Sequence, residues 1–242
     1  MKHRADLWLV ERKLFASRAK AREAIEAGLV FVDGVALTKP SDMVDSKSKI
    51  EAQKPYRWVS RGGLKLEAGL THFEIDAKDR ICLDVGSSTG GFTDVLLSRG
   101  AAKIFAVDVG QGQLHDRLRK NKRVVSLEQT DARNLDATLI PDAPSLIVCD
   151  ASFISLKLVL PQALALAAPD AFLVALIKPQ FEAGREAVRD GKGVVRDEAI
   201  HEAVCADIAK WLAATGWNVL GIAPSPIEGG DGNREFLIGA QK

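Results

Sequence analysis

Two lysines and two acidic residues stand beside predicted strands, where a parallel sheet could bring them together. Asp150 and Lys178 directly follow two apolar strand patterns, Glu235 begins the last one, and Lys65 precedes the first. A lysine whose pKa is lowered by burial or by a second cation can take a proton from a hydroxyl group. Each residue alone is better explained as an exposed charge at a strand end. Together, at one edge of a sheet, the four predict a site that activates a hydroxyl nucleophile.

A glycine-rich turn follows the first of these strands and opens a helical pattern. It reads D-V-G-S-S-T-G-G-F-T from Asp84 to Thr93. Gly86 permits a tight exit from the strand, and Gly90 allows a ligand and the helix to approach closely. Asp108 ends the second strand, where its carboxylate can accept hydrogen bonds from both hydroxyls of a ribose. The turn and the acid together predict a nucleoside site.

The nucleoside predicted for this site carries no phosphate. Ser88 stands where a dinucleotide-binding turn needs a second glycine, and the sequence has no Gly-Lys-Ser or Gly-Lys-Thr loop. Both features favour S-adenosylmethionine, whose methyl group is already activated for transfer to an oxygen. Asp131 follows the third strand and has two equal interpretations, an acceptor for the adenine amino group or a helix N-cap.

The elements that must position these residues alternate between apolar strands and helical patterns from Ile81 onward. This alternation is typical of an α/β fold with a parallel, doubly wound sheet. Seven strands are predicted, at 80–85, 103–109, 123–127, 145–149, 171–177, 217–222 and 235–240. Helices are predicted at 93–99, 112–119, 156–168 and 198–215.

Composition excludes several other classes of protein. A hydrophobic content of 47% with 27% charged residues excludes general disorder. The three cysteines, Cys82, Cys149 and Cys205, predict neither a disulfide framework nor a paired-cysteine zinc site, so no metal is expected. The longest apolar run, from Leu158 to Ile177, is interrupted by polar residues and prolines, and the N-terminus lacks a signal-peptide core. We therefore expect a cytoplasmic protein without a membrane span.

The first 61 residues are basic and carry the pattern of a separate small domain. They hold 13 Lys and Arg against 8 Asp and Glu, a net charge of +5, whereas the remainder has −4. Such a segment attracts polyanions, although a solvated helix face is the simpler explanation for a basic cluster alone. A helix over residues 5–14 would bury Leu7, Val10 and Leu14 on one face, with Trp8 as a further candidate for it.

A second helix and a hairpin follow. Ser17 is expected as its N-cap and Gly28 as the glycine that ends it. Asp33 and Gly34 predict a tight hairpin turn, and a short strand is expected at 49–52. The run F-A-S-R-A-K-A-R-E-A-I-E-A-G-L-V-F-V-D-G closely resembles the αL RNA-binding motif of a small-subunit ribosomal protein, pseudouridine synthases and tyrosyl-tRNA synthetases. The resemblance implies that the basic residues Arg4, Arg12, Arg18, Lys20 and Arg22 contact RNA phosphates.

A second resemblance covers essentially the whole chain. The ordered motifs S-R-G-G-L-K-L, L-D-V-G-S-S-T-G-G-F-T, C-D-A-S-F-I-S-L, I-K-P-Q-F-E and G-N-R-E-F resemble the TlyA (hemolysin A) family of ribosomal-RNA ribose 2′-O-methyltransferases, which is related to FtsJ. The resemblance implies a Rossmann-like methyltransferase domain at 62–242 with a mostly parallel seven-stranded sheet. It also implies an RNA-binding domain at 1–54 and a linker at 55–61. That linker reads Y-R-W-V where relatives carry R-x-W-V.

The same resemblance assigns roles to single residues. It implies contacts with S-adenosylmethionine at Gly86, Ser87, Ser88, Thr89, Gly90, Asp108 and Asp131. It implies a catalytic tetrad of Lys65, Asp150, Lys178 and Glu235. In this family reading Lys178 is the base or the group that lowers the pKa of the 2′-hydroxyl, Asp150 holds it, and Lys65 and Glu235 position the ribose. Phe153 matches a position near the site, or it is an ordinary core residue.

Three functions fit the sequence. The leading one is methylation of a ribose, that of a cytidine in the family, in the RNA of ribosomal subunits or ribosomes by a monomeric enzyme. An RNA-binding assembly protein without catalysis is the second. A membrane-active haemolysin is the third, and it ranks last because the sequence has no convincing membrane-active segment.

Overall fold

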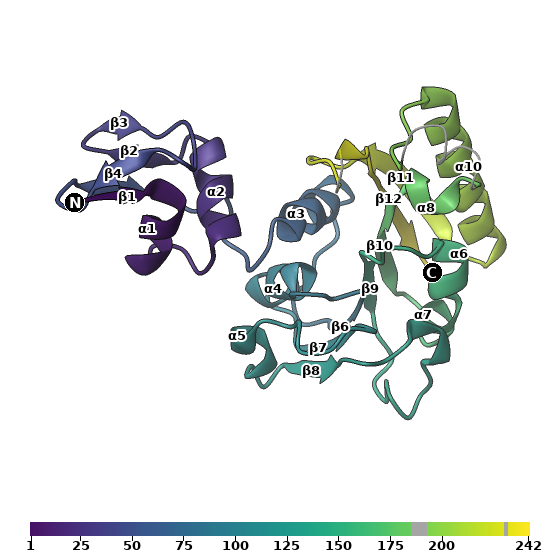
Figure 1. Cartoon of the computed structure of the whole chain (residues 1–242). Coiled ribbons are helices and arrows are strands. Elements are labelled where there is room, and N and C mark those ends of the chain that lie inside the picture. Colours follow the sequence, from purple (N-terminus) through teal and green to yellow (C-terminus); the bar gives the residue numbers. More distant parts are fainter. Residues whose placement is uncertain (185–192, 230–231) are drawn as a thin grey trace. The chain divides into compact units, whose positions relative to one another are not determined.

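The computed structural model describes residues 1–184, 193–229 and 232–242. These residues divide into two compact units, Met1–Arg57 and Trp58–Lys242 (Figure 1). Each unit has a hydrophobic core of its own. We describe the two units separately.

The first unit packs two helices against two small antiparallel sheets. One sheet pairs β3, β2 and β5 in that order, and the other pairs β1 with β4. The elements are β1 (Lys2–Arg4), α1 (Ala5–Glu11), α2 (Arg18–Glu26), β2 (Val30–Val32), β3 (Val35–Ala36), β4 (Met43–Asp45) and β5 (Ile50–Ala52). Trp8, Leu9, Ile25, Val30 and Val44 are buried between them.

The boundaries of α2 and its hairpin confirm the sequence predictions. The Ser17 hydroxyl accepts a hydrogen bond from the backbone N–H of Lys20, as an N-cap does. Gly28 follows the helix with a φ of 69°, the left-handed conformation that a terminating glycine supplies. Asp33 and Gly34 both have positive φ, which matches the right-handed twist of the β2–β3 hairpin.

The predicted buried face of the first helix is correct for two residues and wrong for two. Trp8 is buried and Val10 packs against the core, whereas Leu7 and Leu14 remain 45% and 38% exposed and the buried Leu9 was not predicted. The helix ends at Glu11, and Lys13 takes a positive φ, so Leu14 lies beyond it. The helical spacing from Leu7 to Leu14 therefore does not apply, and the first turn of α1 packs through Ala5, Trp8 and Leu9 instead.

The second unit contains the predicted mostly parallel sheet of seven strands. Its strand order is β11-β12-β10-β9-β6-β7-β8, and β12 runs antiparallel to both of its neighbours. The strands are β6 (Ile81–Val85), β7 (Lys103–Val107), β8 (Val124–Leu127), β9 (Leu146–Cys149), β10 (Phe172–Ile177), β11 (Asn218–Pro224) and β12 (Phe236–Gln241). The chain order reverses between β6 and β9, and a crevice that binds ligands is expected beyond their carboxyl ends.

Helices cover both faces of this sheet (Figure 1). They are α3 (Gly62–His72), α4 (Gly91–Ser98), α5 (Asp116–Arg119), α6 (Leu156–Val159), α7 (Pro161–Ala165), α8 (Pro179–Glu182) and α10 (Glu198–Ala214), with a 3-10 turn, η1, at Ala132–Asn134. The predicted helix over 156–168 is divided, because Pro161 starts a new helix at its N1 position. The predicted helix over 112–119 is shortened, since Gly112 has a positive φ and His115 is the N-cap.

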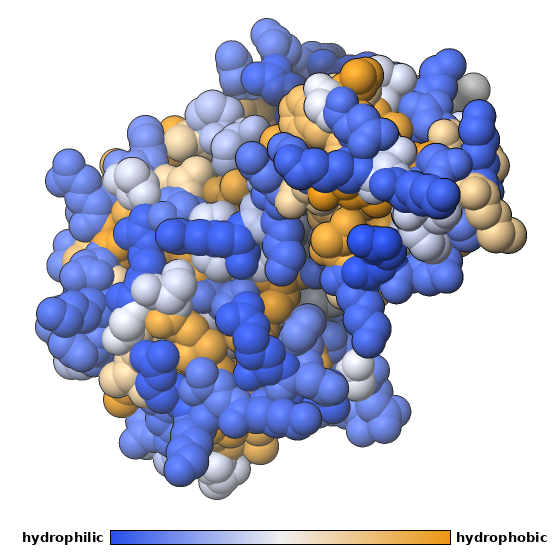
Figure 2. Space-filling model, turned by 90° about the vertical axis from the view of Figure 1, so that its left-hand side faces the viewer, coloured by the Kyte–Doolittle hydropathy of each residue, from blue (hydrophilic) through white to orange (hydrophobic). Residues whose placement is uncertain are grey.

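A helix that spans a membrane must be both long and predominantly apolar. Among the described residues, every helix is too short or too polar to cross a membrane. Figure 2 shows a face on which hydrophilic residues predominate and hydrophobic ones lie scattered between them.

Candidate active site

The glycine-rich turn leaves β6 and passes close to the end of β9. Gly86 has a φ of 80°, and a Cβ there would lie 2.9 Å from the Cα of Ala151. Gly90 has a φ of 95°, and a Cβ there would collide with the side chain of Leu118. Only glycine fits either position without displacing its neighbours. Glycine at position 86 therefore allows the turn to pass close to the backbone of Ala151.

Asp108 connects this turn to the end of β7. Its carboxylate accepts a hydrogen bond of 2.8 Å from the Ser88 backbone N–H and one of 2.7 Å from that of Gly110. Each carboxylate oxygen keeps a second lone pair, so Asp108 can still accept from a ligand. Asp108 lines a cavity of about 470 Å³ that also reaches Gly86, Ser88 and Asp131.

Asp131 acts as the N-cap of η1, which was one of its two interpretations. Its carboxylate accepts from the Arg133 backbone N–H at 2.9 Å and pairs with the Arg133 guanidinium at 2.6 Å. The hydrogen bond from that guanidinium lowers the pKa of Asp131. A ligand that uses Asp131 as an acceptor must therefore share it with Arg133.

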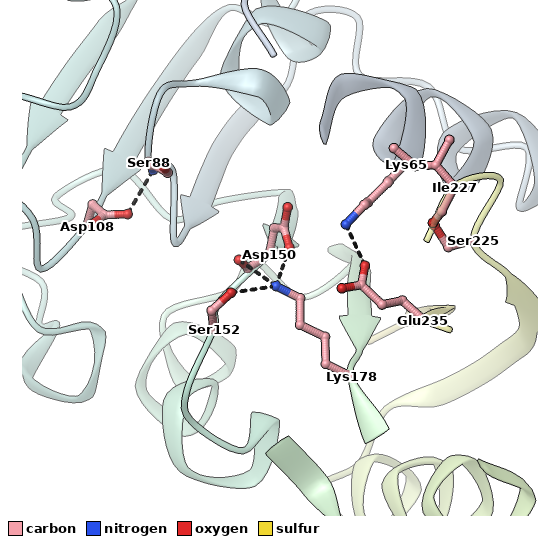
Figure 3. A network of polar contacts seen from close by, with 9 residues as sticks. All are labelled: Lys65, Ser88, Asp108, Asp150, Ser152, Lys178, Ser225, Ile227 and Glu235. Carbon is pink, nitrogen blue, oxygen red and sulfur yellow. Dashed lines mark hydrogen bonds and ion pairs between the residues drawn. The ribbon is translucent and has the colours of Figure 1, made fainter. Parts of the chain in front are cut away.

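Lys178 is buried at the end of β10 with three polar partners. Its Nζ lies 2.6 Å from Oδ1 of Asp150 and donates to the Ser152 hydroxyl at 2.8 Å and the Asp150 carbonyl at 3.3 Å (Figure 3). The Lys178 side chain is 7% exposed and that of Asp150 is 22% exposed. The lysine is thereby fixed while its carboxylate partner still reaches the cavity.

Lys65 and Glu235 form a second buried pair beside the first. The Nζ of Lys65, on α3, lies 2.5 Å from Oε2 of Glu235, and both side chains are less than 10% exposed (Figure 3). Ile177 of β10 pairs with Phe236 of β12 in an antiparallel register. That register places Glu235, the residue before Phe236, opposite Lys178, the residue after Ile177.

One cavity of about 520 Å³ collects both pairs and the glycine-rich turn. Its lining includes Lys65, Asp150, Lys178 and Glu235, together with Gly86, Ser87, Ser88 and Thr89. Gly90 lies behind the turn, against Leu114 and Leu118. This cavity and the one at Asp108 share five lining residues, which are Gly86, Ser88, Asp150, Ser152 and Phe153. An elongated ligand can therefore extend from Asp131 to the two lysines.

Several residues of the site were not identified from the sequence. The Ser152 hydroxyl accepts a hydrogen bond from Lys178. Its position two residues after Asp150 is the feature of the sequence from which it could have been predicted. Asp84 lies under the turn and accepts a bond of 2.6 Å from the Thr93 hydroxyl, while burial raises its pKa to about 7. Asn233 binds the backbone of Gly193 and Val195 beside the same cavity. Sequence patterns give no signal for such contacts with remote loops.

Phe153 contradicts the interpretation as a core residue. The residue is 89% exposed, and its ring centroid lies 5.0 Å from that of Phe181. Phe153 also has a φ of 65°, an unusual conformation for a bulky residue. It lines both cavities.

The predicted RNA-contacting residues of the first unit lie on β1, α2 and the end of α1. Arg4 and Arg18 both bind the buried carboxylate of Asp6, at distances of 2.9–3.2 Å. The Arg12 guanidinium lies 5.6 Å from the centre of the Trp8 ring. Lys20 and Arg22 lie on α2, where Arg22 is exposed and Lys20 is half-buried.

Asp6 is expected to stabilise the first unit in a pH-dependent way. The hydrogen bond from Arg4 is the largest of the contacts that lower its pKa from 3.8 to about 2. The folded state thus binds this proton less readily than the unfolded state, and the stabilisation is present above about pH 4 and lost as the pH falls to about 2. We expect Asp6→Asn to reduce the opening free energy of α1 and α2 by about 2 kcal/mol at pH 7 and by much less at pH 2.5.

Hydrogen exchange of peptides from residues 5–26 measures this effect. Glu11→Gln changes an exposed carboxylate on the same helix and is the control. Equal protection of Asp6→Asn and Glu11→Gln at pH 7 would contradict the prediction.

The predicted linker residues lie on both sides of the division between the units. Arg57 ends the first unit, while Trp58 and Val59 belong to the second and are buried there. The Val59 backbone N–H donates to the carboxylate of Asp94 at 2.9 Å, and Arg117 pairs with the same carboxylate at 2.6 Å. The segment that enters the second unit is thereby fixed to α4.

Comparisons with known proteins agree with both units. Residues 58–242 match the FtsJ-like methyltransferase family, and residues 4–50 match the S4 domain. The chain is 44% identical to the 16S/23S rRNA (cytidine-2′-O)-methyltransferase TlyA of Mycobacterium tuberculosis, over 97% of this chain and 88% of that protein. It is 41% identical to Hemolysin A of Brachyspira hyodysenteriae, over 91% and 92% of the two chains. A solved structure from Streptococcus thermophilus, named as a hemolysin, is 42% identical and has a TM-score of 0.78. The match covers 100% of this chain and 88% of that one.

Proposed function

Since the chain belongs to the FtsJ-like methyltransferase family, we propose that it transfers the methyl group of S-adenosylmethionine to the 2′-hydroxyl of a cytidine in ribosomal RNA. One observation carries the proposal. The buried Lys178–Asp150 pair lies in the same cavity as the Lys65–Glu235 pair and the glycine-rich turn. Charged groups that could act on a hydroxyl therefore line the same cavity as a turn that can hold a nucleoside.

The residues present fit S-adenosylmethionine. The Ser87 hydroxyl, in the turn that lines the cavity, is buried without a hydrogen-bond partner among the described residues. An unpaired buried hydroxyl is costly unless a ligand completes its bonding. We assign Gly86, Ser87, Ser88, Thr89 and Gly90 to the methionine part of the cofactor, Asp108 to its ribose and Asp131 to its adenine. When bound, the cofactor supplies a methyl group on a sulfonium leaving group.

The tetrad prepares the ribose hydroxyl. Lys178 either accepts the proton of the 2′-hydroxyl or stabilises the forming oxyanion as an ammonium. Asp150 and Ser152 hold its Nζ at a fixed point, which reduces the entropy that alignment costs. Lys65 and Glu235 offer a donor and an acceptor in the same cavity, where they position the sugar. Their burial strengthens each of these interactions.

The proposal is tested by locating the transferred methyl group. The protein is incubated with tritiated S-adenosylmethionine and with ribosomal subunits from a strain that lacks this gene. We expect label in rRNA that is recovered as 2′-O-methylcytidine. Label on a base, or RNA binding without any label, would contradict the proposal, and the latter result would favour a non-catalytic assembly protein.

We further propose that the enzyme works as a monomer in the cytoplasm on assembled ribosomal subunits. RNA recognition is supported by the match of residues 4–50 to the S4 domain. We assign phosphate contacts to the basic residues Arg4, Arg12, Arg18, Lys20 and Arg22. We also propose that the RNA-binding domain comprises residues 1–54, the linker 55–61 and the catalytic domain 62–242.

Charge reversal on α2 is expected to weaken RNA binding. Lys20→Glu with Arg22→Glu removes two cations and adds two anions to the helix that follows Ser17. We expect at least a tenfold loss of affinity at about 0.1 M salt and a shallower dependence of log affinity on log salt. Fluorescence anisotropy with rRNA measures both quantities. A salt slope equal to that of the unchanged protein would return these residues to the simpler role of a solvated helix face.

A further inference from the structure

Gln113 lines the cavity at Asp108, and none of the cofactor contacts proposed above involves it. The Ser88 hydroxyl donates to Oε1 of Gln113 at 3.1 Å, and this bond orients the carboxamide. The Nε2 atom at the other end of the carboxamide has no hydrogen-bond partner among the described residues. Both of its N–H groups can therefore donate to a ligand in this cavity.

The carboxamide of Gln113 lies beside the carboxylate of Asp108. A Cβ at Gly110 would collide with Nε2 of Gln113 and would lie 3.0 Å from Oδ1 of Asp108, so both polar atoms lie close to the same point. Ser88 connects the two residues, because its backbone N–H donates to Asp108 and its hydroxyl donates to Gln113 (Figure 3). Ser88 has a φ of 45°, which is uncommon for a residue other than glycine and often marks a ligand site.

The backbone of Gln113 is fixed on two sides. Its N–H donates to the Glu128 carboxylate at 2.6 Å, and the N–H of Leu114 donates to the same carboxylate at 3.0 Å. The His115 N–H donates to the Thr89 carbonyl at 3.2 Å, which attaches this segment to the glycine-rich turn. A donor on a fixed backbone loses less conformational entropy when it binds a ligand.

A ribose needs a hydrogen-bond donor from the protein as well as an acceptor. Each of its hydroxyls has one O–H to donate and two lone pairs that accept. A carboxylate such as that of Asp108 only accepts, so it pairs with the O–H groups and leaves the lone pairs of the hydroxyl oxygens without a partner. An amide N–H beside the carboxylate supplies the missing donor.

We propose that Gln113 is a further cofactor-binding residue, whose carboxamide donates to a ribose hydroxyl of S-adenosylmethionine while Asp108 accepts from the hydroxyls. The proposal rests on the proposed function, because it assumes that the cavity at Asp108 holds the ribose of the cofactor. Gln113 then contributes to cofactor affinity and leaves the methyl transfer itself to the tetrad.

The test compares two ligands by calorimetry with the full chain, S-adenosylhomocysteine and its 2′,3′-dideoxy analogue. We expect Gln113→Ala to weaken binding of S-adenosylhomocysteine about fivefold, the effect of one neutral hydrogen bond. We expect the dideoxy analogue to lose less than about twofold, because it has no ribose hydroxyl for the amide to bind. A general distortion of the loop would weaken both ligands equally. In turnover, the KM for S-adenosylmethionine is expected to rise by the same factor as the loss of affinity, with kcat unchanged.

Gln111→Ala is the matched control. Gln111 is an exposed glutamine of the same loop and is not among the residues that line either cavity. We expect this variant to bind both ligands as the unchanged protein does.

Gln113→Glu separates the bond to Ser88 from the bond to the ligand. Glutamate keeps an oxygen that accepts from the Ser88 hydroxyl, but it replaces the amide donor with a second carboxylate beside Asp108. We expect a loss of S-adenosylhomocysteine affinity on the order of tenfold or more, larger than that of Gln113→Ala.

Two outcomes overturn the inference. One is an equal loss of affinity for the two ligands in Gln113→Ala, and the other is a Gln113→Glu variant that binds S-adenosylhomocysteine as tightly as the unchanged protein. If the unchanged protein itself does not bind S-adenosylhomocysteine, the proposed function fails together with the inference. If the unchanged protein and all three variants bind it equally, only the role of Gln113 is refuted.

Discussion

Lys178→Ala is expected to reduce methyl transfer by at least about 10³-fold and to leave cofactor binding intact. The Lys178 Nζ is the group that Asp150 and Ser152 hold in the tetrad cavity. Its removal takes away the base or cation that acts on the 2′-hydroxyl, so we expect kcat to fall while affinity is kept. Single-turnover methylation of ribosomal subunits measures the rate. Calorimetry with S-adenosylhomocysteine measures cofactor binding.

A second variant separates the two roles of this lysine. Lys178→Arg keeps a cation that can stabilise an oxyanion but cannot accept a proton at neutral pH. Recovery of most activity in Lys178→Arg assigns charge stabilisation, and a loss equal to that of Lys178→Ala assigns proton transfer. Lys157→Ala removes a more exposed lysine of α6 and is the control. Unimpaired turnover in Lys178→Ala would refute the role of Lys178.

Asp108→Asn is expected to weaken S-adenosylmethionine binding on the order of 10²-fold. The carboxylate keeps lone pairs for two ribose hydroxyls, and each charge-assisted hydrogen bond contributes about 1.5–3 kcal/mol. Asparagine retains one acceptor oxygen, so one of the two backbone bonds from Ser88 and Gly110 is also lost. Calorimetry gives the affinity, and saturating cofactor is expected to restore much of the turnover.

Asp142→Asn is the matched control for Asp108→Asn. Asp142 is a half-exposed aspartate that pairs with Lys103 on the surface. A circular dichroism melt of each variant shows whether the fold is kept. Equal cofactor affinities for the two variants would remove Asp108 from the proposed cofactor site.

Much of the second unit follows from the sequence, because its buried strands are apolar and short. The patterns at 80–85 and 145–149 correspond to β6 and β9 within one residue at each end. The helix α3 was not predicted, since two glycines in its first turn lower helix propensity. Its Gly63 packs against Trp58, a tertiary contact that propensity does not describe.

The residues of the candidate site could be predicted from the sequence, but only part of their spatial arrangement could. Asp150 and Lys178 follow neighbouring parallel strands, so their proximity could be inferred from strand ends. The place of Glu235 depends on the antiparallel register of β12 against β10, which local patterns do not determine. The pair of Asp131 with Arg133 and the positions of Ser152 and Asn233 likewise depend on loop conformations that form only in the folded chain.

Phe153 has a consequence for attempts to engineer this protein. A non-glycine residue at a φ of 65° costs about 1–2 kcal/mol, and a residue that is 89% exposed recovers little of this cost by packing. A laboratory selection for heat resistance alone would therefore favour glycine or asparagine at this position early. Because Phe153 borders both cavities, we expect the variants selected in this way to have a higher thermal stability and a lower turnover. A selection for stability should therefore also select for catalytic activity.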